Sequence, residues 1–566
     1  MVETITSADR RANRRVARAA VSCCLITWLS GLGCAGPSQH AGLTPPTAGA
    51  RWPDALALTS ERSGYRATET QTDVIAILDE LATRSPVARR ATLGFTTEGR
   101  EIPLLIIADP PIEAPAEARR TGRIVVYLQA CIHGGEVCGK PALLQLAREI
   151  LLDPDSPDRH LLDDLVLVIA PVYNADGNDR MAVGNRGPAQ NGPELGMGRR
   201  VNAQGLDLNR DHMKLESPEA RALLRFLSEW DPELTIDTHT TDGSRHEFAL
   251  TYAASQNPSG HPAPLELTRD EMLPEVSAGL RSRTGLRTFF YGNLNRELTK
   301  WATYSHLPRF ATPYRGLRGR MSILSEAYAY DTYKQRVAST REFVRECLRW
   351  AAGRREDITR TLDRAARNTV HAPMGDDGDE IGIRYKIASF DEPAVIPALV
   401  PDDWDALRRG EPTRFTRRTV TVEHFGRFEP TLTVRRPFAY ILPAEAAGVV
   451  EKLEQHGVRV DRLDHDVSLD AEVYTVKRVD RAEREFQGHL LATVDVSSAR
   501  ERALAPAGSW VVPMDQPLAN LVVYLLEPAS DDGLAAWGFM DDWLVPGTRF
   551  PMLRAMAPES AWSPAP

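Results

Sequence analysis

Three side chains that can bind a metal ion stand out in this sequence. His133 and Glu136 enclose two glycines in the segment His133-Gly134-Gly135-Glu136, and His239 lies farther along the chain. Imidazole nitrogens and carboxylate oxygens are common zinc ligands, and a catalytic zinc ion usually keeps three protein ligands and one open position. A His-x-x-Glu pair arises often by chance, so the prediction depends on the third residue. Together the three residues predict a site for one zinc ion per chain.

Two further groups have the chemistry to serve such a site. Glu326 follows an aliphatic run, where a charge is costly unless it is paired or functional. It is therefore a candidate general base for a zinc-bound water. Arg210 adjoins Asn209, and a planar guanidinium beside an amide is suited to hold a carboxylate. Taken alone, Arg210 is as well explained as a surface arginine in a loop.

Buried strands are expected to position these residues. Aliphatic-rich runs stand directly before the candidate residues, at 124–129, 234–238 and 321–325. Segments with helical spacing lie between them, and strands that alternate with helices predict an α/β fold with an open mixed sheet flanked by helices. Sites in such folds form at the carboxyl ends of the strands, so we expect the candidate residues to meet there.

In order and spacing, these residues resemble the zinc carboxypeptidases of the carboxypeptidase A type. The resemblance spans about residues 60–350. It runs through H-x-x-E, then N-x-D-G from Asn174 to Gly177, then D-x-N-R, then a histidine and a late glutamate. It implies that the three candidate ligands hold zinc.

The resemblance also implies a role for each remaining site residue. Asn209 and Arg210 are similar to the pair that binds the terminal carboxylate of the substrate. Glu326 is similar to the glutamate that activates the zinc water and later protonates the leaving amine. Asp207 resembles an acid that orients a ligand histidine, as zinc histidines commonly require.

Three positions match the family pattern less closely. Arg200 resembles the arginine that polarises the scissile carbonyl and stabilises the oxyanion, with Arg199 as a competitor. Tyr314 is the favoured candidate for the tyrosine that caps the substrate, and Tyr304 is the alternative. Gly135 stands where the pancreatic enzymes carry an arginine, so one remote substrate contact is missing.

The resemblance implies a zinc metallocarboxypeptidase that removes C-terminal residues from peptides with a free C-terminus. On the same framework, an N-acyl amino acid deacylase or a peptidoglycan stem-peptide peptidase is an alternative. A non-catalytic binding protein anchored at the surface is an alternative of another class, although the intact set of ligands argues against it. An arginine-rich loop can favour acidic substrate side chains or can simply be solvated. Its members are Arg309, Arg315, Arg318 and Arg320.

The composition excludes some classes of protein. The 566 residues include 77 acidic and 68 basic side chains, for a formal charge of −9, so there is no electrostatic case for a nucleic-acid partner. A basic segment precedes an uncharged stretch over residues 19–50, as in a secretory signal. We expect a signal peptide over 1–34, of lipoprotein type if Cys34 is lipidated. This predicts an exported protein, extracellular or in the cell envelope, with Cys34 as its candidate membrane attachment.

The rest of the chain is expected to divide into a tether, two domains and a linker. The tether covers 35–55, the catalytic domain 56–367, the linker 368–380 and a smaller β-rich C-terminal domain 381–566. Strands are expected within the last domain at 419–422, 431–434 and 521–526. Its segment Asp531-Asp532-Gly533, with Trp537 nearby, is typical of a turn packed on core aromatics, and less so of a sugar or calcium site.

Overall fold

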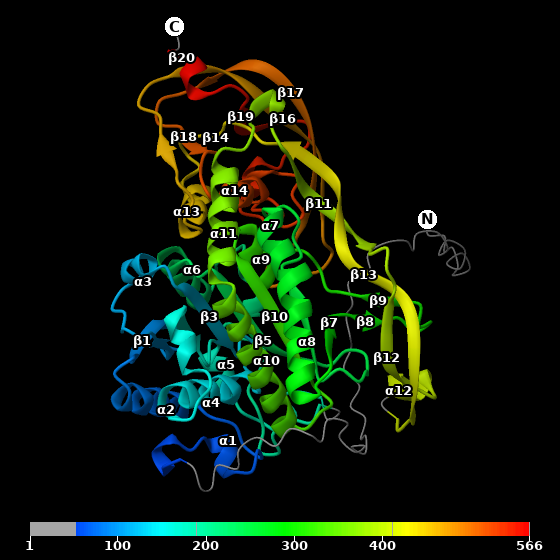
Figure 1. Cartoon of the computed structure of the whole chain (residues 1–566). Coiled ribbons are helices and arrows are strands. Elements are labelled where there is room, and N and C mark those ends of the chain that lie inside the picture. The colour runs from blue at the N-terminus through cyan, green and yellow to red at the C-terminus, as the bar shows by residue number, and fades with distance from the viewer. Residues whose placement is uncertain (1–51, 188–189, 410, 565–566) are drawn as a thin grey trace, which may run out of the picture.

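The computed structural model describes residues 52–187, 190–409 and 411–564 (Figure 1). An eight-stranded sheet forms the centre of its first part. In sheet order its strands are β1 (Ala88–Phe95), β2 (Glu101–Ile107), β4 (Leu165–Ala170), β3 (Ile124–Ala130), β5 (Leu234–Thr241), β10 (Met321–Tyr328), β6 (Leu250–Ala254) and β7 (Thr288–Phe290). Strands β4, β3, β5 and β10 run parallel to one another. The antiparallel pairs are β1 with β2, β2 with β4, and β6 with β10, whereas β7 runs parallel to β6. The expected open mixed sheet is confirmed.

Helices cover both faces of this sheet because the strands are apolar on both sides. In β3, Val126 and Leu128 belong to one hydrophobic cluster, and Val125 and Tyr127 belong to another on the opposite face. The first face carries α2 (Gln71–Arg84), α4 (Gly139–Leu152), α8 (Leu273–Thr284), α10 (Tyr333–Gly353) and α11 (Arg355–Val370). The second carries α3 (Pro115–Thr121), α6 (Pro218–Trp230) and α9 (Ala311–Leu317). Shorter helices are α1 (Thr59–Arg62), α5 (Ala175–Asp179) and α7 (Pro262–Glu266).

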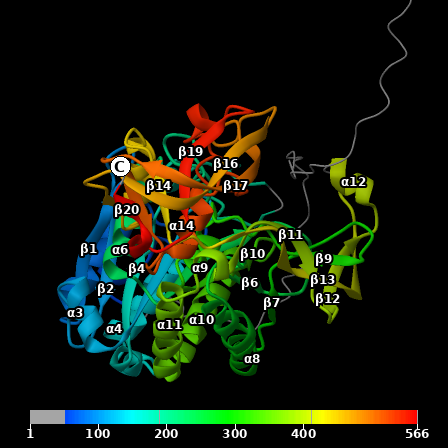
Figure 2. The ribbon, with the colours of Figure 1, turned by 90° about the horizontal axis from the view of Figure 1, so that it is seen from above.

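The C-terminal region is rich in β-structure, as expected, and it forms two further sheets. One contains β14 (Ala439–Leu442), β15 (Asp461–Arg462), β16 (Val467–Arg481), β17 (Ala492–Ala505), β18 (Trp510–Pro513), β19 (Arg549–Ala555) and β20 (Ser563–Pro564). The other joins β11 (Glu380–Ser389), β12 (Ala394–Pro401) and β13 (Phe415–Arg435) to β8 (Asn293–Leu294) and β9 (Lys300–Ala302). Three helices complete the region, α12 (Trp404–Arg409), α13 (Ala447–Gln455) and α14 (Ala519–Leu526). In Figures 1 and 2, β12, β13 and α12 lie at the β7 end of the molecule, away from β1.

Two expectations for this region are wrong. Residues 521–526 form part of the helix α14 instead of a strand. The helix is buried and apolar on all sides, so the sequence has no periodicity that separates a helix from a strand. The two strands expected at 419–422 and 431–434 are halves of one strand, β13. Its first half pairs with β12 and its second half with β11, so its two ends have different surroundings.

The two parts of the chain share a core. The cluster beneath α6 and α9 continues into the C-terminal region, where it includes Tyr440, Leu453 and Val522. The sheets are also joined, because β9 pairs in parallel with β13. The expected linker, 368–380, covers the last residues of α11, the segment that follows and the first residue of β11. The division into domains stays a prediction.

The expected signal peptide and most of the tether lie outside the described residues. Leu56 and Leu58, directly after the tether, are buried in the core beneath α2. Within the described ranges, no helix combines the length and the apolar character needed to cross a membrane.

Candidate active site

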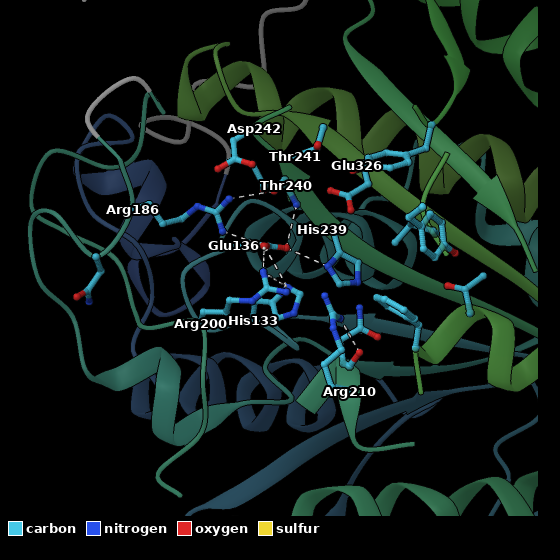
Figure 3. Close-up of a pocket in the computed structure, with 17 residues that line it drawn as sticks. His133, Glu136, Arg186, Arg200, Arg210, His239, Thr240, Thr241, Asp242 and Glu326 are labelled. Carbon is cyan, nitrogen blue, oxygen red and sulfur yellow. Dashed lines mark hydrogen bonds and ion pairs between the residues drawn. The ribbon is translucent and has the colours of Figure 1, made fainter. Parts of the chain in front are cut away.

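The carboxyl ends of three neighbouring parallel strands carry the candidate residues. His133 and Glu136 lie in the turn between β3 and α4, and His239 lies near the end of β5. Glu326 lies on β10, directly beside His239 in the strand pairing. Figure 3 shows these side chains converging on one pocket. The sheet therefore brings together residues that are far apart in the sequence, at the edge where α/β folds build sites.

The turn that carries His133 is packed too closely for side chains at its two glycines. A Cβ atom at Gly134 would lie 2.4 Å from the carbonyl carbon of Gly177, and one at Gly135 would lie 2.7 Å from the Gly198 oxygen. The same loops are tied together by Asn174, because its Nδ2 group donates to the backbone oxygens of Ile132 (3.3 Å) and Arg200 (3.1 Å). The backbone next to His133 is thus fixed to the segment that carries Arg200.

The three candidate ligands form one buried cluster. Nδ1 of His133 lies 3.0 Å from Oε1 of Glu136, and Nδ1 of His239 lies 2.9 Å from Oε2 of the same carboxylate. Ligand atoms of all three residues lie within 4.8 Å of one another. The structure thus brings together the three residues that the sequence predicts as metal ligands.

A carboxylate also holds the far nitrogen of each histidine. Nε2 of His133 lies 3.0 Å from Oδ1 of Asp207, and Nε2 of His239 lies 2.8 Å from Oδ2 of Asp237. An ionised carboxylate only accepts hydrogen bonds, so each Nε2 carries the proton. In a neutral imidazole, the lone pair of Nδ1 then faces the lone pairs of Glu136. Such facing acceptors need a positive charge between them, either a proton on Nδ1 or a metal ion.

The pKa values reflect the same excess of negative charge. Burial opposes protonation of His239, but Asp237 and Glu136 outweigh it and raise the pKa of the imidazole well above its usual value. Burial likewise opposes ionisation of Glu136, but His133 and Arg186 hold its pKa well below the usual range. The site attracts cations while its carboxylate ligand stays ionised, so the donor set and its charge fit a zinc ion.

Glu326 lines the same cavity with a free carboxylate oxygen. Its Oε2 is buried and accepts no hydrogen bond from any described residue. Burial raises the pKa of Glu326 to about 8, against the attraction of His239. A carboxyl group with a raised pKa that faces a cavity is well placed to exchange a proton with a substrate or water.

Asn209 and Arg210 also line the cavity. The guanidinium of Arg210 stacks on the ring of Phe310, 4.1 Å from its centroid, and its nearest carboxylate contact is Asp207 at 3.9 Å. Its Nη1 also donates to the backbone oxygen of Asn209 (2.7 Å), and its other donors remain available to a ligand. The Oδ1 atom of Asn209 accepts a hydrogen bond from the backbone of Ala311 (2.8 Å), which leaves its amide donors for the same ligand.

Of the two adjacent arginines, Arg200 reaches the cavity. Its Nε donates to Asp207 (2.9 Å) and its Nη1 lies 3.4 Å from Glu136, whereas Arg199 is exposed outside the cavity lining. Asp207 also accepts a hydrogen bond from the backbone of Asn209 (2.9 Å). One carboxylate thus contacts the metal-binding cluster, the oxyanion candidate and the carboxylate-binding pair.

The structure corrects the choice of tyrosine. Tyr314 is fully buried outside the cavity, and its hydroxyl lies 2.7 Å from Nδ1 of His456 in the C-terminal region. Tyr304 and Tyr291 line the cavity instead. Tyr314 lies within the buried helix α9.

The arginine-rich loop also differs from both expectations. None of its four arginines lines the cavity. Arg309 and Arg315 are buried, Arg318 donates to the backbone oxygen of His456, and Arg320 forms an ion pair with Asp231. These arginines therefore hold neighbouring elements together.

Two residues at the site were missed in the sequence. Asp237 holds His239, and its position two residues before that histidine was the only available signal. Arg186 binds Glu136 through Nη1 (2.8 Å) and the backbone oxygen of Thr240 through Nη2 (3.1 Å). The Arg186 side chain also packs against Gly135, because its Cδ would lie 3.3 Å from a Cβ atom at that position. An arginine from another loop therefore lies next to the position where the pancreatic enzymes carry one. No motif marks Arg186.

The cavity itself has a volume of about 220 Å³. One side is polar, formed by the histidines, Glu136 and the arginines labelled in Figure 3. The remaining wall contains Tyr291, Tyr304, Phe310, Thr312 and Leu324. A metal-binding cluster, a free carboxylate and unpaired guanidinium donors in one cavity define a class of protein, the zinc-dependent hydrolases.

Comparison with known proteins narrows this class. Residues 74–259 match the family model of the M14 peptidases, described as zinc carboxypeptidase. The matched range contains the three candidate ligands, Asp207, Asn209 and Arg210, and it ends before Glu326. The chain is also 24% identical over 487 residues to "Carboxypeptidase 2" of Trichophyton rubrum, covering 81% of this chain and 82% of the relative. A second relative, "Carboxypeptidase 2" of Trichophyton tonsurans, is 23% identical over 482 residues, with 81% of each chain covered.

Solved structures with a similar arrangement include a metallo-carboxypeptidase from Burkholderia cenocepacia and a carboxypeptidase A from Helicoverpa armigera. The first has a TM-score of 0.38 and 18% identity, and the match covers 50% of this chain and 69% of that one. The second has a TM-score of 0.37 and 19% identity, covering 51% of this chain and 74% of that one.

Residues 74–259 form a zinc carboxypeptidase domain of the M14 type, and the chain is a zinc metallopeptidase of the carboxypeptidase type. The resemblance seen in the sequence is thereby confirmed. The deacylase, stem-peptide and non-catalytic alternatives are not favoured.

Proposed function

We propose that the chain binds one zinc ion through His133, Glu136 and His239 and removes the C-terminal residue of peptides with a free carboxylate. Zinc held there supplies Lewis-acid chemistry, which polarises carbonyl groups and acidifies water toward neutral pH. The observation that carries the proposal is that the unpaired donors of Arg210 line the same cavity as the three ligands.

The protein's own residues divide the remaining work. Glu326, with its unpartnered carboxylate oxygen, takes the proton from the attacking water and later delivers it to the leaving amine. Arg200 donates to the oxygen on which negative charge develops during attack. Arg210 and Asn209 bind the terminal carboxylate, and Tyr304 closes the cavity beside them. Asp207 and Asp237 hold the two histidines in the tautomer that leaves Nδ1 for the metal.

A comparison of peptides with free and amidated C-termini tests the substrate assignment. Amidation removes the charge that Arg210 binds, and we expect the kcat/KM to fall at least about 10- to 100-fold, the range for a hydrogen bond to a charged group. In the variant Arg210→Gln, the kcat/KM values for the free and the amidated peptide should be closer to each other than in the wild type. Arg225→Gln, at an exposed position on α6, serves as the control and should preserve it. Equal rates on both peptides would reject a carboxypeptidase.

We also propose that the protein is exported and attached to a membrane through a lipid on Cys34. The basic segment, the uncharged stretch and the cysteine at its end support this proposal. Fractionation of cells that express the full chain should find it outside the cytoplasm and, in part, with the membrane. Cys34→Ser should release it from the membrane and stop incorporation of a labelled fatty acid, whereas Cys23→Ser should not. A cytoplasmic, unlabelled wild type would reject both parts.

A further inference from the structure

A buried carboxylate of the C-terminal region, Asp532, binds the segment 303–312, which forms one wall of the cavity. Asp532 is fully buried. Its Oδ2 accepts a hydrogen bond from the backbone of Arg309 (2.7 Å), and its Oδ1 accepts one from Arg309 Nε (2.8 Å). The indole of Trp537 also donates to Oδ1 (2.8 Å), and the Arg309 guanidinium lies 4.7 Å from the centroid of that ring. Both the backbone and the side chain of Arg309 are therefore fixed from the C-terminal region.

The residues directly after Arg309 contact the pair proposed to bind the substrate carboxylate. Phe310 supplies the ring on which the Arg210 guanidinium stacks. The backbone of Ala311 donates to Oδ1 of Asn209. A shift of Arg309 would thus move both supports of the carboxylate-binding pair. The path from Asp532 to the substrate passes through one arginine and two consecutive residues.

The C-terminal region holds the same segment at its other end. The backbone of Thr303, next to Tyr304, donates to the backbone oxygen of Phe425 on β13 (2.9 Å). Nε2 of His306 lies 2.9 Å from Asp531. Residues 303–312, which include the cavity-lining Tyr304, Phe310 and Thr312, are therefore anchored on both sides.

These contacts account for the acidic pair seen in the sequence. The oxygens of Asp532 are taken by Arg309 and Trp537, and those of Asp531 are taken by His306 and Tyr524. Each of the four carboxylate oxygens has a protein donor, which agrees with the expected turn packed on core aromatics.

We propose that Asp532 is a positioning residue for substrate recognition, and that through Arg309 the C-terminal region sets the geometry with which Arg210 and Asn209 bind the terminal carboxylate. This inference rests on the proposed function of that pair. Because Asp532 touches neither the ligands nor Glu326, it acts on substrate binding and leaves the metal site and the proton transfer intact.

The test compares Asp532→Asn with the wild type in the full-length, zinc-loaded protein. Asparagine is similar in size but lacks the charge that Arg309 pairs with. We expect the KM for peptides with a free C-terminus to rise about 10- to 100-fold, the effect of a small displacement of a binding group, with a much smaller change in kcat. Zinc content should stay the same. A KM equal to that of the wild type would overturn the proposal.

A matched control separates positioning from general damage. Glu527 is likewise buried in the C-terminal region, and it accepts hydrogen bonds from Tyr440 (2.6 Å) and Tyr474 (2.8 Å), away from the cavity lining. Glu527→Gln should lower the thermal stability but leave the KM unchanged. An equal rise of the KM in both variants would show a loss of folding and would also overturn the proposal.

A binding measurement removes the dependence on turnover. The wild type should bind 3-phenylpropionate more tightly than its amide, and Asp532→Asn should lose most of that difference. If Asp532→Asn fails to fold, Arg309→Lys tests the same link with the charge retained, and it should weaken binding of the acid alone. A wild type that does not distinguish the acid from the amide would reject the proposed function. A wild type that does, with variants that match it, would reject the role of Asp532.

Discussion

The two carboxylates that hold the histidines of the candidate zinc site give the sharpest quantitative test of the site. Asp237 binds Nε2 of His239 at 2.8 Å and accepts a second hydrogen bond from Gln129 at 3.1 Å. Tyr127 in turn donates to Gln129 at 3.0 Å, so Asp237 is held by a buried chain of hydrogen bonds. Replacing Asp237 should therefore weaken zinc binding through His239 without removing any ligand.

Two substitutions separate the charge of Asp237 from its hydrogen bond. In Asp237→Asn, the amide oxygen can still accept from His239, and the Gln129 amide can turn to accommodate the new donor, so mainly the negative charge is lost. Asp237→Ala removes the hydrogen bond as well. Groups of this kind change metal affinity by 10- to 100-fold. We expect the zinc dissociation constant to rise about 10-fold for Asp237→Asn and about 100-fold for Asp237→Ala, or about 1.4 and 2.7 kcal/mol.

Competition with a chromophoric zinc chelator measures these affinities without reference to turnover. Asp176→Asn is the matched control, since Asp176 is equally buried and accepts hydrogen bonds from the Thr96 hydroxyl (2.7 Å) and the Glu98 backbone N–H (3.0 Å) but does not contact a candidate ligand. It should lose stability and keep its zinc affinity. Zinc affinities of both Asp237 variants equal to that of the wild type would refute the reasoning that Asp237 tunes His239.

Two further predictions concern the general base and the interface between the two parts of the chain. Glu326→Gln should retain zinc and lose at least about 100-fold in kcat, the lower range for a general base, and full turnover would remove Glu326 from that role. His456 is buried and neutral, because its Nε2 donates to the Met213 oxygen (3.1 Å) and its Nδ1 accepts from Tyr314. Burial lowers the pKa of His456 from 6.5 to about 3, so the unfolded chain binds a proton below pH 6.5 that the folded chain does not. Stability should therefore fall between pH 6.5 and about 3, with a contribution of about 1.4 kcal/mol per pH unit. Denaturant unfolding of His456→Gln should show a pH dependence of the free energy of unfolding that is smaller by about 1.4 kcal/mol per pH unit. A pH dependence equal to that of the wild type would contradict a neutral His456.

The sequence predicted the residues whose chemistry depends on strand ends. His133, His239 and Glu326 each follow an aliphatic run, and parallel strands bring their carboxyl ends together whatever the loops between them do. Asp207, Asn209 and Arg210 were predicted from the D-x-N-R pattern that this chain shares with the zinc carboxypeptidases, and they lie within four consecutive positions. For these residues, local order in the chain already determines proximity in space.

The residues that were missed or misplaced depend on contacts between distant loops. Tyr314 and Tyr304 are ten positions apart in the sequence. Tyr314 contacts His456, 142 positions away, and therefore points away from the cavity that Tyr304 lines. Arg186 reaches Glu136 because Gly135 leaves room for its side chain. No local pattern in the sequence around Arg186 predicts this contact. The helix α14 was misread because it is apolar on all sides, and the strand β13 was misread because its two halves pair with different strands.

Asp207 explains why an exopeptidase can be built from these parts. Cleavage of a single terminal residue requires a fixed separation between the metal and the group that binds the carboxylate. Asp207 bonds to the metal-site histidine His133, to Arg200 and to the backbone of Asn209, so it joins the two ends of that separation. Its own backbone N–H donates to Gln487 of the C-terminal region (2.8 Å). The C-terminal region therefore contacts both Asp207 and the cavity wall beside Arg210. Substitutions that weaken these contacts should change the selection of substrates more than they change the affinity for zinc.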